Sequence, residues 1–418
     1  MTTTSKTSLS FAGEYFIEEC YMETRDGVSI DFMAQVSSIV VYEDLFSPFI
    51  SGALFLRDTL DLPNLFGRGG MNVLKLKIHT PSFPERTSIN GFFHVYKMAD
   101  RELSKQREQT YTLRFISLEA VSDQKKLSRS FSGSPEVIAE TLVKKYLDSK
   151  KPLISNPTSN QIKYVSNLWT PTRNMTYLSE NARRKEGVAN YLFFENRDGF
   201  NFRNISDIAE ENPIQKFSYN DYLTVAKNDA APQYVTRDKN EDYKKILDLK
   251  IDVTYDYEKD RDVGAIKTSL YVADPVLKRY KTIRYSMGSD KSQRLNKNLP
   301  YSDVVIGLTD NFSESLNRYY NAFDRGDPSN LNYLQARVAQ LRRYQSLKIE
   351  IQVLGRMDYT VGRKVQVEIP YVRNIGPNDE PIDKLYSGMY IISAISHSFG
   401  SDRHTCTIEL IKDSTLLT

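Results

Sequence analysis

Four histidines and two cysteines are the side chains of this sequence best suited to hold a metal ion. Each histidine falls in a predicted strand, and the four are His79, His94, His397 and His404. None has the HExxH spacing or another spacing typical of metal ligands. His397 and His404 could meet across the last predicted hairpin, but no carboxylate completes a triad. We therefore interpret the histidines as ordinary strand residues and predict no metal site.

The two cysteines, Cys20 and Cys406, lie far apart in the sequence. Cys20 has neither a nearby histidine nor a helix N-terminus to activate its thiol, so we do not expect a nucleophile. Cys406 falls in mid-strand, where a cysteine usually acts as a small buried hydrophobe. Two thiols are weak evidence for an oxidising compartment, and no disulfide is predicted.

No other motif points to catalysis or to a cofactor. The sequence has no Walker A motif and no GxSxG motif. The Gly-rich segment 67–70 could bind an anion through its amides, but it leads into a strand, so a plain turn is expected. The 53 Asp and Glu residues leave open a carboxylate pair that cleaves glycosides, although none is singled out. We predict no catalytic residue, no cofactor and no enzyme activity.

The composition is that of an ordinary soluble protein rich in β structure. Of 418 residues, 40% are hydrophobic and 26% charged, and 27 Tyr and 20 Phe favour strands. The net charge of +3 is too small to demand a nucleic acid or an anionic membrane. There is neither an apolar run of membrane-spanning length nor an N-terminal secretory signal. We expect folding in the cytoplasm, without specific nucleic-acid binding or direct membrane insertion.

One pattern of strands occurs twice, once near each end of the chain. It reads as a strand, a loop, a Gly-led aromatic strand, a turn and a strand. The first copy has its strands at 72–78, 91–96 and 111–117. The second copy has them at 364–369, 388–395 and 404–410. Residue identity between the copies is low, so the match is one of pattern, and it predicts two copies of one antiparallel β-module.

Helical periodicity appears between the copies. A helix is predicted at 135–148, and a second opens at Pro171 and ends at Gly187. An aromatic hairpin follows at 191–202, and further helices are expected at 312–323 and 331–341. The predicted fold class is β-rich α+β. Its divisions are a β-domain at 10–122, an α+β middle domain at 123–215, the start of a second β-module at 216–255, an insert at 256–345 and the rest of that module at 346–414.

Several stretches, taken in order, carry a family resemblance. They are Tyr42–Phe46 with Ser51–Asp58, Leu168–Leu178 with the hairpin at 191–202, and Gly388–His397 with His404–Ser414. The ordered set resembles the baseplate hub proteins of contractile-tailed bacteriophages. It is also similar to the hub portion of type VI secretion spike proteins. The stretch at 286–300 and the helices at 312–345 match no motif of that family.

The resemblance implies two tail-tube-like antiparallel β-barrel modules with α+β insert domains. It also implies a homotrimer, in which six quasi-equivalent modules form a ring between a six-fold tail tube and a three-fold spike. The implied partners are the chain itself, a central spike trimer, the tail tube or tube-initiator proteins, and the tape measure protein. The implied location is the virion tail baseplate, after assembly in the host cytoplasm. Because the chain stops at Thr418, just past the closing hairpin, a separate spike polypeptide is expected.

Exposed edges of β-sheets are hazardous, so the edge strands of the modules are expected to pair with neighbouring subunits. On pattern alone, the candidate interface residues are Leu74, Leu76, Ile78, Val365, Val367 and Ile369. Four arginines, Arg183, Arg184, Arg342 and Arg343, are expected not to converge on the ring lumen, because strong binding would hinder passing DNA. A hub of a secretion or other contractile injection apparatus is the alternative function. A tail-associated cell-wall hydrolase is a third, less favoured one.

Overall fold

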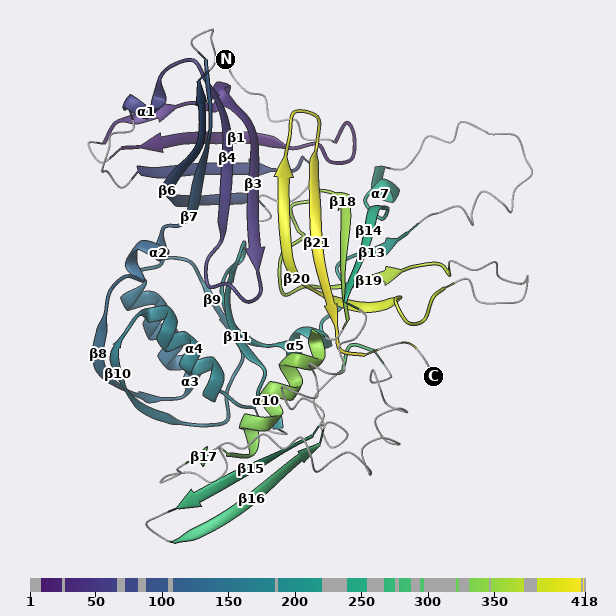
Figure 1. Cartoon of the computed structure of the whole chain (residues 1–418). Coiled ribbons are helices and arrows are strands. Elements are labelled where there is room, and N and C mark those ends of the chain that lie inside the picture. The colour runs from purple at the N-terminus through teal and green to yellow at the C-terminus, as the bar shows by residue number, and fades with distance from the viewer. Residues whose placement is uncertain are drawn as a thin grey trace, which may run out of the picture.

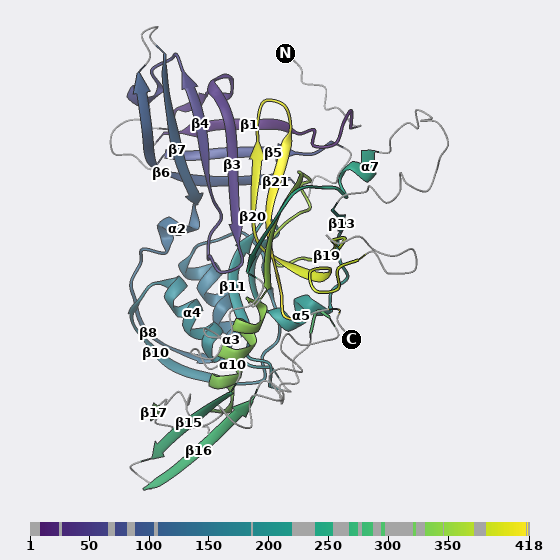
Figure 2. The ribbon, with the colours of Figure 1, turned by 45° about the vertical axis from the view of Figure 1, so that its right-hand side comes forward.

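The structure is a computed structural model, in which one large antiparallel sheet stands beside an α+β region and a separate hairpin (Figures 1 and 2). It describes residues 9–24, 27–65, 72–81, 88–103, 108–184, 187–219, 239–253, 267–274, 278–286, 294–296, 321–322, 331–345, 347–371, 382–414 and 416. The segment 67–70 and most of 286–300 and 312–323 lie outside these residues. In the described part, no helix is long and apolar enough to cross a membrane.

The first β-region forms because apolar and polar residues alternate along its strands, as in β5, where Leu74 and Leu76 point inward and Lys75 and Lys77 do not. Its elements are β1 (Phe16–Glu23), β2 (Ser29–Asp31), η1 (Met33–Gln35), β3 (Val36–Asp44), β4 (Ser51–Asp58), α1 (Leu62–Leu65), β5 (Asn72–His79), β6 (Ile89–Leu103) and β7 (Gln109–Ser117). Strand β6 continues well beyond the 91–96 expected from the sequence.

The middle region packs helices against two small sheets around its own core (Figure 1). Its elements are α2 (Glu119–Ser122), β8 (Leu127–Gly133), α3 (Pro135–Thr141), the π-helical turn η3 (Leu142–Tyr146), β9 (Leu153–Ser155), β10 (Ile162–Trp169), α4 (Pro171–Asn181), β11 (Tyr191–Asn196), β12 (Gly199–Asn204) and α5 (Ile205–Glu210). Thr170 caps α4 by accepting from the Arg173 N–H. The expected end of this helix at Gly187 is wrong, because extended backbone begins at Ala182.

The rest of the chain completes the large sheet and adds a projecting hairpin. Its elements are β13 (Lys216–Ser218), α7 (Lys239–Asp242), β14 (Ile246–Val253), β15 (Lys267–Asp274), β16 (Arg279–Ser286), β17 (Asn321–Ala322), α10 (Leu331–Tyr344), β18 (Leu347–Leu354), β19 (Lys364–Glu368), β20 (Gly388–Phe399) and β21 (His404–Lys412). Helix α10, expected at 331–341, holds the hairpin through Gln335, whose amide donates to Thr268 Oγ1 at 2.9 Å.

Two parts of the large sheet repeat one order of strands. Module 1 is defined by the order β3-β4-β7-β6-β5-β1, and module 2 by the order β14-β18-β21-β20-β19-β13. Position by position, β5, β6 and β7 match β19, β20 and β21, which are the strands of the repeated sequence pattern. All neighbours are antiparallel except β13, which runs parallel to β19. The order of strands is therefore repeated, as the sequence pattern predicted, whereas the parallel pairing of β13 differs from the antiparallel pairing of β1.

The closed barrels are not confirmed. In module 2 an isolated bridge joins Ser218 to Lys245, the residue before β14, but β13 and β14 form no ladder among the described residues. The two modules are also not separate sheets, since β20 of module 2 pairs with β3 of module 1 within a 13-stranded sheet. The described structure is thus β-rich, with large antiparallel sheets and few helices. Each module keeps its own core.

Gly52 of β4 lies under the ring of Phe115 and beside the backbone of β3. A Cβ atom at this position would meet Phe115 Cζ at 2.3 Å and the Val40 carbonyl oxygen at 2.4 Å. The carbonyl belongs to a strand ladder and cannot withdraw, so we expect Gly52→Ala to lower the free energy of unfolding by about 3 kcal/mol. Urea denaturation followed by circular dichroism measures this. Gly91→Ala is the control, because the atom nearest to its Cβ position is the side-chain atom Phe93 Cζ at 3.3 Å. An equal loss there would contradict the steric explanation.

Candidate functional site

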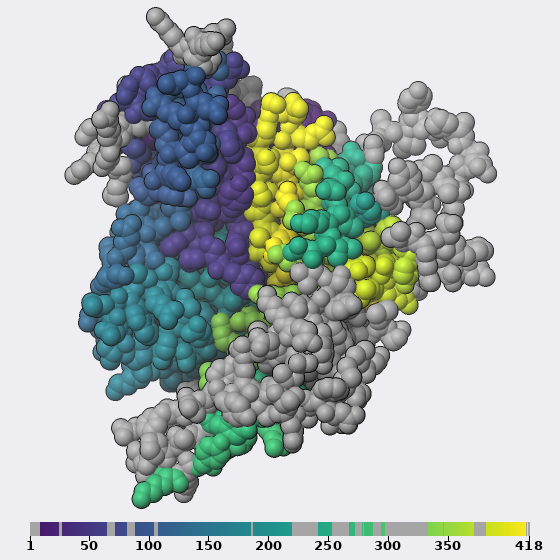
Figure 3. All heavy atoms as spheres, viewed as in Figure 1, coloured from purple at the N-terminus to yellow at the C-terminus, as the bar shows by residue number. Residues whose placement is uncertain are grey.

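The junction between the modules is an antiparallel ladder between β3 and β20. It extends from the pair Ile39 and Phe399 to the pair Asp44 and Ala394, and the Leu45 N–H donates to the Ser393 carbonyl at 2.7 Å. In Figure 3 the yellow atoms of β20 and β21 lie directly against the purple atoms of module 1. The ladder completes the core of module 1, in which Ile39 and Phe399 are both buried.

The buried carboxylate of Glu43 fastens this junction to the loop after β18. It accepts hydrogen bonds from the hydroxyl of Thr360 and, at 3.2 Å, from the Val361 N–H. Burial raises the pKa of Glu43, while Arg197 and the two hydrogen bonds act in the opposite direction. The side chain is 2% exposed, so its hydrogen bonds replace those it would make with water.

In the part of the chain that the structure describes, the strands equivalent to β3 and β20 each have an edge without a ladder. Strand β14, the counterpart of β3, forms a ladder with β18 alone among the described residues. Strand β6, the counterpart of β20, pairs with β5 from Ile89 to Val95 and then continues to Leu103 with β7 alone in the described part. Among the described residues, module 2 therefore has an edge at β14 that corresponds to β3, and module 1 has an edge at β6 that corresponds to β20.

Apolar side chains at these two edges are incompletely covered. Ile251 lies opposite the fully buried Ile349 and therefore on the core face of the sheet, yet it is 41% exposed. Met98 lies opposite the buried Leu113, also on the core face, and is 37% exposed. The residue of β3 that corresponds to Ile251 of β14 is Val41. Strand β20 covers Val41, which is 1% exposed. The edges of β14 and β6 therefore resemble the two strands of the β3–β20 junction, but no partner strand that the structure describes covers their apolar residues.

The six interface residues predicted from the sequence lie elsewhere. All are buried in the two module cores, from 0% exposed for Leu74, Leu76, Ile78, Val365 and Val367 to 6% for Ile369. Strand β5 lies between β1 and β6, and β19 lies between β13 and β20. The premise that these are edge strands is therefore wrong, although a subunit contact through them stays a prediction. The part of β6 that extends beyond β5 is an edge that becomes visible only in the structure.

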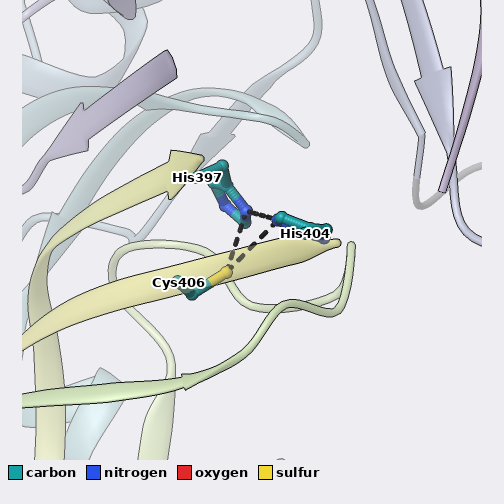
Figure 4. A group of neighbouring side chains, drawn as sticks. All are labelled: His397, His404 and Cys406. Carbon is teal, nitrogen blue, oxygen red and sulfur yellow. Dashed lines mark hydrogen bonds between the residues drawn. The ribbon is translucent and has the colours of Figure 1, made fainter. Parts of the chain in front are cut away.

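The two histidines of the last hairpin meet, and Cys406 joins them (Figure 4). His397 and Cys406 face each other in the β20–β21 register, and His404 lies on the same face two residues before Cys406. The distances are 3.0 Å from His397 Nδ1 to His404 Nε2, 3.2 Å from Cys406 Sγ to His397 Nδ1, and 3.4 Å from Cys406 Sγ to His404 Nε2. All three side chains are fully buried. Burial lowers the pKa of His397 to about 3, with a smaller contribution from the nearby Arg197.

Lys151 connects module 1 to the middle region. Its ammonium group lies 2.7 Å from Glu119 and 2.6 Å from Glu195, and Glu195 also accepts from the Ile50 N–H at 2.9 Å. Burial alone would lower the pKa of Lys151, but the two carboxylates outweigh it and raise the pKa. Burial raises the pKa of Glu195, against the attraction of Lys151. Lys151 and Glu195 therefore each favour the charged form of the other.

The arginines considered for a lumen make contacts within the chain. Arg184 pairs with Asp207, and Arg343 lies 3.6 Å from the buried Asp413. The Arg183 guanidinium lies 5.0 Å from the centre of the Tyr333 ring. These contacts give the cations a structural role in the folded chain. Their orientation relative to a ring lumen stays a prediction.

Comparison with solved structures relates the chain to tail proteins, whereas no family model and no curated protein matches it. The prophage MuSo2 43 kDa tail protein from Shewanella oneidensis has a TM-score of 0.56 and 9% identity, covering 96% of this chain and 100% of that one. The tail protein from Neisseria meningitidis MC58 has a TM-score of 0.55 and 10% identity, over 96% and 97%. A type VI secretion component of E. coli, c3393, which is described as similar in structure to the T4 tail proteins gp27 and gp5, has a TM-score of 0.44 and 10% identity, over 96% and 76%. The chain therefore has the fold of bacteriophage tail proteins, in agreement with the resemblance stated from its sequence.

Proposed function

We propose that the chain is a structural baseplate hub protein. In this proposal three copies form a ring whose six tube-like β-modules adapt a six-fold tail tube to a three-fold central spike. The observation that carries the proposal is the repeated strand order of modules 1 and 2. The likeness to two tail proteins over nearly the whole chain supports it.

The ring follows from repeating the junction between chains. Within one chain β3 pairs with the second half of β20. We infer that β14 of one chain pairs in the same way with the second half of β6, about residues 97–103, of the next. Such a head-to-tail contact closes into a ring when the rotation is right, so three contacts within chains alternate with three between chains. The exposed apolar edge residues Ile251 and Met98 become covered in this contact.

The proposed partners are a second and third copy of the chain, a central spike trimer, the tail tube or tube-initiator proteins, and the tape measure protein. The proposed location is the tail baseplate of the virion. A hub of a secretion or other contractile injection apparatus would use the same ring and differ in its neighbouring genes. We propose no catalytic role, and we expect the purified chain not to clear cell-wall material.

The mass of the purified protein in solution tests the ring directly. Light scattering is made on the chain alone and together with the product of the neighbouring spike gene. We expect three times 48.1 kDa for the chain alone, or that mass plus the mass of the bound spike in the mixed sample. A monomer in both samples would overturn the proposal and reopen the hydrolase alternative.

Engineered disulfides test which strands meet. We expect cysteine at Ile251 in β14 to form a disulfide between chains with cysteine at one of Met98, Ala99 or Arg101 in β6, because facing residues of antiparallel strands have Cβ atoms about 5 Å apart. The readout is a covalent ladder up to the trimer on a denaturing gel. Cysteine at Val137, which is 55% exposed on α3, is the control partner. The pairing would be excluded if cysteine at Val137 gave a ladder as strong as the β6 positions do. It would also be excluded if no β6 position gave a ladder.

A further inference from the structure

The cluster at the tip of the last hairpin has the composition and shape of a metal site. We propose that His397 Nδ1, His404 Nε2 and Cys406 Sγ bind one thiophilic d10 metal ion, Zn²⁺ or Cu⁺. Imidazole nitrogen and thiolate sulfur are the ligands that these ions prefer. The inference does not depend on the proposed hub function.

The three atoms already converge on one point (Figure 4). They form a triangle with sides of 3.0, 3.2 and 3.4 Å. Bonds of about 2.0 Å to nitrogen and about 2.3 Å to sulfur require ligand separations of roughly 3.3 to 3.7 Å in a tetrahedral ion. The ligands therefore need to open by only a few tenths of an ångström, and an ion would sit just above their plane.

Backbone groups hold two of the three ligands in place. His397 Nε2 lies 3.1 Å from the Tyr359 carbonyl, so the ring proton belongs on Nε2 and the lone pair of Nδ1 points into the triangle. A carbonyl that orients a histidine in this way is a common outer contact of metal ligands. Burial raises the pKa of the Cys406 thiol, and the backbone N–H of Arg356, which donates to Cys406 Sγ, acts in the opposite direction. Binding forms two N–metal bonds and one S–metal bond and releases the thiol proton to solvent.

The net charge of the occupied site would differ between Zn²⁺ and Cu⁺. Arg197 and Glu43 both act electrostatically on Cys406, and their charges are of opposite sign. With the thiolate, Zn²⁺ would leave one positive charge in this buried site, whereas Cu⁺ would leave none. The thiolate excludes hard ions such as Mg²⁺ and Ca²⁺, which prefer oxygen ligands.

The ion would also strengthen the junction between the modules. His397 pairs with Val41 of β3 on one side and with Cys406 of β21 on the other. His404 follows the turn after Phe399, which closes the core of module 1. A metal bridging β20 and β21 here would fix the edge on which β3 lies.

The first experiment measures metal in the untagged full-length chain, produced in medium with zinc and copper and purified without chelator. Mass spectrometry of the metals is expected to find about one equivalent of zinc or copper per chain. The chain is then unfolded with chelator and refolded with Co²⁺, which is expected to give a thiolate-to-cobalt charge-transfer band. Less than about one-tenth of an equivalent, with no such band in the refolded wild-type chain, overturns the proposal.

Matched variants locate the metal. Cys406→Ser and His404→Gln are expected to lose the charge-transfer band and most of the bound metal. Cys20→Ser and His94→Gln remove the other cysteine and a histidine outside the cluster, and they are expected to keep both signals. Retention of the band in Cys406→Ser would place the metal elsewhere and overturn the assignment. The wild-type result remains decisive if a variant fails to fold.

Discussion

Ile251→Asp is expected to convert the proposed trimer into monomers without unfolding the chain. Ile251 is 41% exposed on β14, so in one chain the carboxylate reaches water. In the proposed ring the same carboxylate would be buried against β6 of the next chain. An unpaired buried charge costs about 3 kcal/mol, which weakens each contact between chains by about a hundredfold.

Light scattering of Ile251→Asp at micromolar concentration is the measurement, and thermal unfolding checks the fold. Met98→Asp is expected to give the same result from the opposite edge, because each contact needs both strands. Val137→Asp makes the same charge change at a site that is 55% exposed on α3, and it should leave the trimer intact. If the wild-type chain is a trimer and both edge variants remain trimeric, the pairing of β14 with β6 is wrong, although another ring geometry stays possible.

The sequence is sufficient to predict the strands of the repeated pattern. Alternation of apolar and polar residues in 72–78 and 364–369 identified β5 and β19, and Pro135 and Pro171 marked the starts of α3 and α4. These signals are local, so a single sequence contains them. The two tail proteins share the fold of this chain at 10% and 9% identity, so the fold tolerates wide differences in residue identity.

The order of strands within the sheet could not be obtained in this way. Pattern alone suggested β5 and β19 as edges, but pairing places each between two neighbours. Edges are decided by partners far away in the sequence, such as β3 and β20, which are separated by more than three hundred residues. For the same reason, the contact of Cys406 with His397 could not be predicted from the sequence. Its neighbours in sequence indicate only a buried strand, whereas the β20–β21 register brings it to His397.

Lys151→Met is expected to cause a loss of stability of about 4 kcal/mol at neutral pH, because it leaves Glu195 and Glu119 without their cation. Glu195 is 1% exposed and Glu119 is 8% exposed, so water cannot replace the ammonium group. The measurement is urea denaturation followed by the fluorescence of Trp169, the single tryptophan, which lies in the middle region that Lys151 anchors. Lys144→Met is the control, since Lys144 pairs with Glu140 at the surface and its ion pair is worth less than about 1 kcal/mol.

The effect of Lys151→Met is expected to shrink as the pH falls. Burial raises the pKa of Glu195 in the folded chain, and without Lys151 the attraction that opposes this rise is lost. The folded variant then binds more protons than the unfolded variant, so acidification stabilises it relative to the wild type. Adding Glu195→Gln to Lys151→Met removes one of the stranded charges and should recover part of the loss at pH 7. A deficit that is independent of pH and unchanged by Glu195→Gln would show that Lys151 acts through packing of its aliphatic chain rather than through charge, because only a charged group responds to both changes.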